Sequence, residues 1–292
     1  MVEPLEDYER MLESLDFLVR ACGDLIDDNE ASWRANSQAA AESATFSDTE
    51  AVRVAYSQAS LAITVAGDNT FAIVRALTQP VMTVAPWVLA RAVLESASVA
   101  AWLLDPKIDA STRVSRSMSL RLKHLRDEVT YARSALARHP GADKDFTKAI
   151  EEGNRRIDGL PSVAQKRSIS PGHDKKGKLI GFPDATPAST DLADNLGEGD
   201  TYRLLSALAH GRSWAIMPLA ARNAGVVAGV PVIEQHLSAN SAIFLMAGVA
   251  EWFSKPMWNY VLLNGWDLGR LEGIFEEAFD RLHMVDDRRF WR

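Results

Sequence analysis

VMTVAPWVLARAVLESASVAAWLL, residues 81–104, is the most apolar stretch of the sequence and the best guide to its fold. The stretch is long enough to cross a bilayer, but Arg91 and Glu95 stand near its middle, where membrane helices rarely carry charge. We therefore expect a buried helix of a soluble protein, and no membrane partner. Pro86 suits the first turn of that helix, and the proline that follows Leu104 and Asp105 marks its end.

The segments on both sides of this stretch repeat the helical period of apolar residues. Leu5, Leu12 and Leu15 recur at helical spacing. The run Ser47-Asp48-Thr49-Glu50 offers an N-cap signal for a helix from about Ala51 to Leu77. Further helices are expected at residues 111–138, 201–209, 214–222, 234–253 and 268–282. Only Lys-Leu-Ile-Gly-Phe, residues 178–182, resembles a strand. The sequence therefore predicts an all-α fold, a single helical bundle over residues 1–292.

Residues 141–200 differ in composition from the helices around them. Apart from a short helix expected at 146–157, this segment is rich in glycine and proline, which favour turns and loops. Five cations make it basic: Lys166, Arg167, Lys175, Lys176 and Lys178. A loop of this length is unusual inside a compact domain. We expect a loop-rich basic insertion within the bundle.

The overall composition excludes several protein classes. The chain has 292 residues, 47% of them hydrophobic, and a formal net charge of -7, which excludes collagen-like, disordered and globally basic proteins. The single cysteine, Cys22, cannot form an internal disulfide or a multi-cysteine zinc site, and the acidic N-terminus lacks the pattern of a signal peptide. We expect a cytoplasmic protein. The phosphate-binding, dinucleotide-binding and zinc-protease motifs are missing from the sequence, so no cofactor and no metal are expected.

The most informative segment for function is TYRLLSALAHG, residues 201–211. On a helix, Arg203, Ser206 and His210 share one face. Gly211 suits the left-handed position that follows a helix, so His210 can be a capping residue without any function. Alternatively, His210 transfers a proton and Arg203 binds a phosphate, because histidine titrates near neutral pH and arginine matches the geometry of phosphate oxygens.

These two residue types suffice for cleavage of RNA without a metal. The 2′-hydroxyl of RNA is itself the nucleophile, so a histidine acid or base and a cationic phosphate clamp form a minimal set. A homodimer would supply two such sets. Arg203 and His210 are therefore the candidate catalytic residues.

The Arg-x6-His spacing of Arg203 and His210 resembles the motif of the HEPN superfamily (higher eukaryotes and prokaryotes nucleotide-binding). The resemblance implies a helical bundle that acts as a metal-independent endoribonuclease in phage defence or a toxin–antitoxin system, with RNA and an antitoxin as partners. Segments at 90–97, 101–106 and 202–211 are also similar to actinobacterial helical proteins of unknown function. The alternative is a non-catalytic helical protein that binds a ligand or another protein.

The polar residues of the apolar stretch are the expected neighbours of this motif. Arg91 and Glu95 are spaced for an ion pair on one helix face. Because polar groups on apolar helices must satisfy one another, we expect Arg91, Glu95, Tyr202 and His210 to lie close together, with Ser206 supporting the pocket. The pair is either structural or positions Tyr202 or His210 in a shared pocket.

Two further groups of charged residues have an ordinary interpretation and a functional one. The first is a possible phosphate-binding face formed by Arg113, Arg116, Lys123, Arg126, Arg133 and Arg138. The same cations also fit a solvated helix surface. The second group is Glu276, Asp280 and His283, which share a face of the last helix and are best interpreted as solvent-exposed rather than as a metal site.

Overall fold

The computed structural model of the chain describes residues 3–29, 32–78, 81–138, 143–227 and 230–281. Helices dominate these residues, which confirms the predicted all-α class. The chain divides into two compact units. Unit 1 comprises Met1–Ala40, Ala59–Pro106 and Ala188–Arg292, and unit 2 comprises Ala41–Gln58 and Lys107–Pro187. Both units draw on separate stretches of chain, so no linker in the sequence marks the boundary between them.

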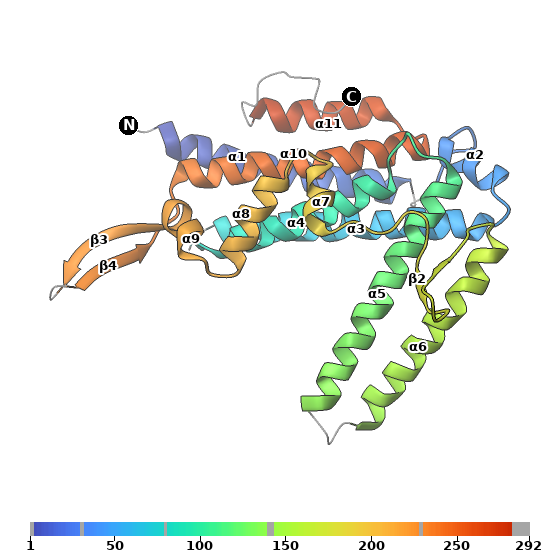
Figure 1. Ribbon diagram of the computed structural model, residues 1–292. Coiled ribbons are helices and arrows are strands. Elements are labelled where there is room, and N and C mark those ends of the chain that lie inside the picture. The colour runs from blue at the N-terminus through green and yellow to red at the C-terminus, as the bar shows by residue number, and fades with distance from the viewer. Residues whose placement is uncertain (1–2, 30–31, 79–80, 139–142, 228–229, 282–292) are drawn as a thin grey trace. The chain divides into compact units, whose positions relative to one another are not determined.

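Unit 1 is built from long helices that pack along one another (Figure 1). They are α1 (Glu3–Asp28), the second part of α3 (Thr49–Leu77), α4 (Ala85–Leu103), α10 (Ala239–Asn264) and α11 (Leu268–Arg281). The predicted apolar helix is α4, with Pro86 in its first turn as expected. Its Trp87, Leu94 and Leu103 are fully buried, so the most apolar stretch forms the centre of this unit's core.

Helix α10 corrects one predicted boundary. It begins after Ser238, whose hydroxyl accepts a hydrogen bond from the backbone N–H of Ser241 at 3.0 Å, and not at Glu234. It then continues past Pro256 to Asn264. The helix ends at Gly265, whose φ of 70° is the left-handed conformation that glycine adopts without strain. The apolar packing of α10 outweighs the single backbone hydrogen bond that a proline removes.

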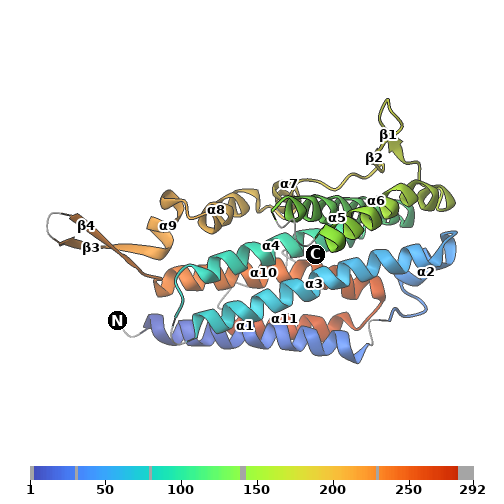
Figure 2. The same ribbon diagram turned by 90° about the horizontal axis from the view of Figure 1, so that it is seen from below.

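Three short helices follow one another beside α4: α7 (Ser189–Asp194), α8 (Gly199–Ala209) and α9 (Ser213–Ala220). Figure 2 shows this row, in which α8 and α7 contact α4. The chain then forms an antiparallel hairpin of β3 (Ala221–Val227) and β4 (Val230–Gln235), which the sequence analysis missed. The β-branched pairs at 226–227 and 232–233 were the available signal.

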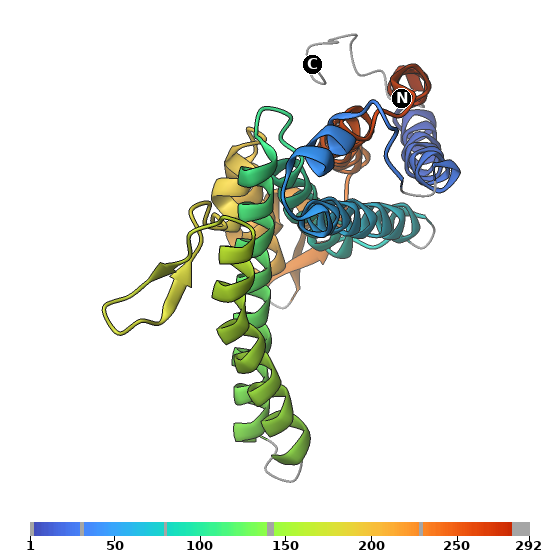
Figure 3. The ribbon, with the colours of Figure 1, turned by 90° about the vertical axis from the view of Figure 1, so that its right-hand side faces the viewer.

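Unit 2 is centred on two antiparallel helices that lie side by side (Figure 3). They are α5 (Ala110–Arg138) and α6 (Asp143–Lys166), accompanied by β1 (Gly172–His173), β2 (Leu179–Gly181), the end of α2 (Gln38–Thr45) and the start of α3. Gly153 permits the close approach of α6, because a Cβ atom there would lie 2.4 Å from a methyl group of Val129. The predicted strand is present as β2.

The helix predicted at residues 146–157 is longer in the structure than expected. Helix α6 has 24 residues and passes through Gly159 and Pro161, which were expected to lie in a loop. Buried Leu160 and Ala164 hold this part of the helix against the unit. The start of α3 is capped as predicted, because an Asp48 carboxylate oxygen accepts from the backbone N–H groups of Glu50 and Ala51.

Within the part of the chain that the structure describes, none of the helices combines the length and the apolar character needed to span a bilayer.

Candidate functional site

Helix α8 presents the two predicted catalytic residues to solvent. Arg203 and His210 are both exposed, and seven helical residues separate them by about 10 Å along the axis. His210 occupies the C-cap, where its backbone N–H bonds the Ser206 carbonyl at 3.1 Å. Gly211 follows with a φ of 68°, as the sequence predicted. Both interpretations of His210, as a capping residue and as a proton-transfer residue, are compatible with this position.

The positive charge of Arg203 is already balanced within unit 1. Its guanidinium lies 2.7 Å from the Asp200 carboxylate and 3.9 Å from that of Asp194. All three side chains are more than half exposed, so these ion pairs contribute little to stability and open at low cost. A phosphate bound by Arg203 would have to replace these carboxylates.

Tyr202 and Arg91 meet between α8 and α4, as expected. A guanidinium nitrogen of Arg91 donates to the Tyr202 hydroxyl at 3.2 Å, and the guanidinium carbon lies 5.4 Å from the centre of the ring. The Nε atom of Arg91 is buried and has no hydrogen-bond partner within the described part of the chain. This contact ties two helices together. The half-buried Ser206 lies one turn further along α8.

The predicted ion pair between Arg91 and Glu95 is wrong. Among the residues that the structure describes, Arg91 has no carboxylate within ion-pair distance, and a Glu95 carboxylate oxygen instead accepts from the Ser189 hydroxyl of α7 at 2.8 Å. Helices α7 and α8 run antiparallel to α4, so Glu95 and His210 lie towards opposite ends of this row. The expected cluster of four therefore reduces to Arg91 and Tyr202, because Ser189 supplies a partner that spacing cannot reveal.

One carboxyl group of unit 1, near the start of α8, has a raised pKa. Glu251 of α10 is half-buried, and its burial, together with the negative charge of Glu198, raises the pKa of its carboxyl. Lys255 opposes this shift. Glu198 is the N-cap residue of α8, so two like charges meet where this helix begins.

Comparisons with protein-family models, curated proteins and solved structures gave no match. The resemblance to the HEPN superfamily therefore stays a prediction that rests on Arg203 and His210.

Unit 2 differs from unit 1 in charge. Its segments contain 18 Lys and Arg against 13 Asp and Glu, a formal charge of +5, whereas the rest of the chain contains 14 against 26, a formal charge of -12. Phosphate groups are attracted to surfaces with an excess of Lys and Arg. The predicted catalytic residues thus belong to the acidic unit, and the net positive charge belongs to the other.

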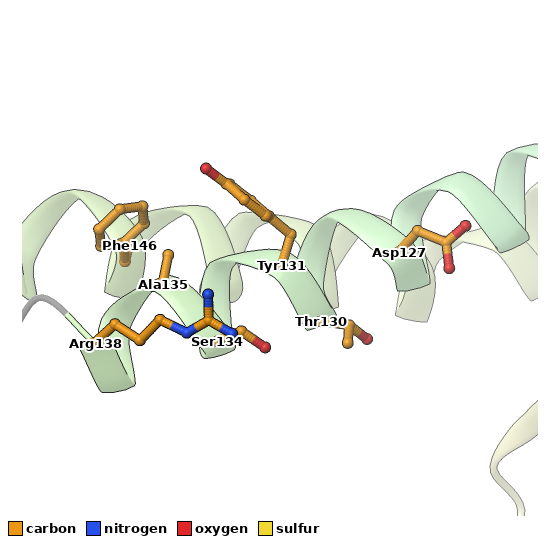
Figure 4. A pocket seen from close by; sticks show the side chains of 7 residues that line it. All are labelled: Asp127, Thr130, Tyr131, Ser134, Ala135, Arg138 and Phe146. Carbon is orange, nitrogen blue, oxygen red and sulfur yellow. The ribbon is translucent and has the colours of Figure 1, made fainter. Parts of the chain in front are cut away.

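One concavity on unit 2 lies between α5 and α6 and has a volume of about 620 Å³. We call it the aromatic concavity; its lining residues are Asp127, Thr130, Tyr131, Ser134, Ala135, Arg138 and Phe146. Figure 4 shows the rings of Tyr131 and Phe146 on either side of the small Ala135. Tyr131 is 71% exposed, which is unusual for a large ring. The sequence analysis overlooked Tyr131, although its spacing from Asp127 and Arg138 places it on a polar face of the helix.

Another concavity, of about 280 Å³, lies between α5, β2 and the chain that follows β2. We call it the hydroxyl concavity; its lining residues are Ser119, Leu122, Lys123, Arg126, Asp127, Ile180, Gly181, Ala185 and Thr186. The Arg126 guanidinium donates to the backbone carbonyls of Leu179 at 2.6 Å and Ile180 at 3.2 Å, which attaches α5 to β2. Because Asp127 lines both concavities, they follow one another along a single face of α5.

The predicted phosphate-binding face of α5 needs one correction. Arg113 is only 1% exposed and pairs with Glu42, so it cannot meet a ligand. Lys123, Arg126 and Arg138 line the concavities, and Arg133 is exposed outside them. Burial and the neighbouring charge of Lys123 lower the pKa of His124, so its imidazole adds no positive charge to this helix near pH 7.

No group of three or more metal-ligating side chains occurs among the described residues. His283, from the set predicted on the last helix, lies outside those residues.

Proposed function

We propose that the protein binds single-stranded RNA through unit 2, along the face of α5 that joins the aromatic and hydroxyl concavities. The observation that carries this proposal is the exposed ring of Tyr131 on a helix face that also presents Lys123, Arg126 and Arg138. Proteins bind single strands by combining cations, which hold the phosphates, with aromatic rings, on which the bases stack.

The dimensions and charge of this face support the proposal. From Ser119 to Arg138 the helix rises by about 28 Å, which is long enough to contact several nucleotides. The formal charge of +5 on unit 2 attracts a polyanion although the whole chain is acidic. The rings of Tyr131 and Phe146 both line the aromatic concavity, with the small side chain of Ala135 between them.

The test measures the affinity of the full chain for a fluorescent single-stranded oligoribonucleotide at several salt concentrations. We expect Tyr131→Ala to weaken binding about tenfold, since stacking contributes about 1–3 kcal/mol per base. Phe244→Ala is the matched control, because Phe244 is a similarly exposed aromatic residue of unit 1. No binding by the wild type, or equal loss in both variants, would refute the proposal.

A second function, cleavage of the bound RNA, is favoured by the exposure of Arg203 and His210 on one face of α8. In this proposal the protein is a HEPN-like, metal-independent endoribonuclease, with His210 transferring the proton and Arg203 holding the phosphate. A homodimer would bring two copies of His210 together, and the 63% exposed Trp214, four residues after His210, supports an interface there.

Cleavage is tested with a chelator present, since the proposed residues need no metal. The expected products end in a 2′,3′-cyclic phosphate, and His210→Ala abolishes their formation. His236→Ala, another exposed histidine of unit 1, is the control. An intact RNA after long incubation with the wild type would leave the non-catalytic binding function alone. Roles in phage defence or toxin–antitoxin systems, an antitoxin partner and a cytoplasmic location stay predictions from the sequence.

A further inference from the structure

Two hydroxyl groups at the hydroxyl concavity have no hydrogen-bond partner among the residues that the structure describes. Ser119 of α5 is 5% exposed, and its Oγ atom is buried without a partner. Thr186, from the chain that follows β2, has a buried Oγ1 atom in the same condition. Both residues line the concavity. Unpaired buried hydroxyls destabilise a fold, so a ligand that bonds both groups would remove this cost.

The charges around these hydroxyls favour an anion. Arg126 is held in place by two backbone carbonyls and has no carboxylate partner among the described residues, so its charge is uncompensated. Lys123 lies 3.0 Å from Asp127, the only acidic side chain of the lining. The three charged groups leave a net charge of +1, which disfavours a metal cation.

We propose that the hydroxyl concavity binds a phosphate group, with the Ser119 and Thr186 hydroxyls donating to its oxygens and Arg126 and Lys123 balancing its charge. A hydroxyl turns towards a ligand by rotation about one bond, and a guanidinium that bonds two carbonyls keeps further N–H donors. Phosphate offers enough acceptor oxygens for all four groups. The volume of about 280 Å³ is larger than the roughly 30 Å³ of one water molecule, so the concavity has room for a group of several atoms.

If the phosphate belongs to bound RNA, this inference rests on the proposed function. A small phosphorylated molecule presents the same chemistry to the concavity. The experiment therefore has two arms, a titration with inorganic phosphate and a titration with the single-stranded oligoribonucleotide. Each arm compares the wild type with Ser119→Ala and Thr186→Val. Thermal melts of the free proteins accompany both arms.

Variants that lack an unpaired hydroxyl distinguish an effect on ligand binding from an effect on the stability of the fold. We expect each variant to melt at the temperature of the wild type or above it, because an unsatisfied group has been removed, and to bind about tenfold more weakly. Ser117→Ala is the matched control, since Ser117 is a buried serine of α5 outside the lining. For charge, Lys123→Gln weakens binding more than Arg133→Gln, which changes an exposed cation outside both concavities.

The outcomes separate this inference from the proposed function. RNA binding that falls in the two hydroxyl variants supports both. If the binding of RNA and the binding of inorganic phosphate are both unchanged in these variants, the phosphate site is overturned and RNA binding is left intact. Binding of inorganic phosphate without RNA supports the site and refutes the proposed function. Absence of binding in both arms, or variants that melt well below the wild type, overturns the inference.

Discussion

Arg113 and Glu42, 71 positions apart in the chain, form a two-point ion pair inside unit 2. The guanidinium Nε and Nη2 atoms donate to the two carboxylate oxygens at 2.9 and 3.0 Å. The Tyr56 hydroxyl donates to the same carboxylate at 3.3 Å, and the Tyr56 ring lies 5.2 Å from the guanidinium carbon. The pair therefore fastens the beginning of α5 to α2 and α3 within this unit.

Removing one partner of this pair leaves a buried charge without compensation. We expect Glu42→Gln and Arg113→Met each to lower the free energy of unfolding by about 3–5 kcal/mol. The double variant Glu42→Leu with Arg113→Met recovers much of this loss, because two apolar side chains need no partner. Denaturant unfolding of the four proteins measures the effect.

The exposed pair of Lys123 and Asp127 is the control for the buried one. Solvent screens this pair, so Asp127→Asn changes the free energy of unfolding by less than about 1 kcal/mol. Equal effects of the buried and the exposed substitutions would contradict the importance of burial for the Arg113–Glu42 pair.

Glu251 predicts a specific pH dependence of stability. The pKa of its carboxyl is raised in the folded state, mainly by burial and further by Glu198. The folded state therefore binds this proton more tightly than the unfolded state does. The ionised carboxylate therefore opposes folding above its folded pKa, and this cost disappears as the pH falls below the ordinary value of 4.5. We expect Glu251→Gln to raise the melting temperature at pH 7.

The comparison across pH tests the sign of this effect. The difference in melting temperature between Glu251→Gln and the wild type should shrink from pH 7 towards pH 4. Glu272→Gln, at an exposed position of α11, serves as the control and should show no such trend. A variant that melts below the wild type at pH 7 would show that the Glu251 carboxylate stabilises the fold instead.

The exposed residues of α8 predict variants with normal stability. Arg203→Ala and His210→Ala should each change the free energy of unfolding by no more than about 0.5 kcal/mol, as surface substitutions usually do. Tyr202→Phe is the contrasting variant, because it removes the hydroxyl that Arg91 contacts and should cost about 1 kcal/mol. Thermal melts measure all three. A large loss for His210→Ala would reveal a structural role and remove it as a clean test of catalysis.

The sequence predicted those helix ends that are determined by residues close to them in the chain. Asp48 caps α3, Pro86 opens α4 and Gly211 closes α8, each at the expected place. Such signals act over one turn of helix, so the sequence alone reveals them. Pro161 and Pro256 were misleading, because packing of the surrounding helix outweighs one lost hydrogen bond.

The contacts of charged residues could not be predicted in this way. Glu95 bonds Ser189, which is 94 positions away, and not Arg91, although the spacing to Arg91 is ideal for an ion pair. The sequence analysis placed Arg113 on a possible phosphate-binding face, but in the fold Arg113 is buried and paired with Glu42. The aromatic concavity depends on the contact of α5 with α6, so only the fold reveals the space around Tyr131.

The opposite charges of the two units have a practical consequence for handling the protein. The isoelectric point of about 5.5 describes the whole chain, so an anion-exchange resin should retain the protein at pH 7. The excess of 18 cations over 13 anions in unit 2 should also retain it on a phosphocellulose or heparin column at low ionic strength. A purification that uses both matrices in sequence would therefore separate this chain from ordinary acidic proteins, which flow through the second column.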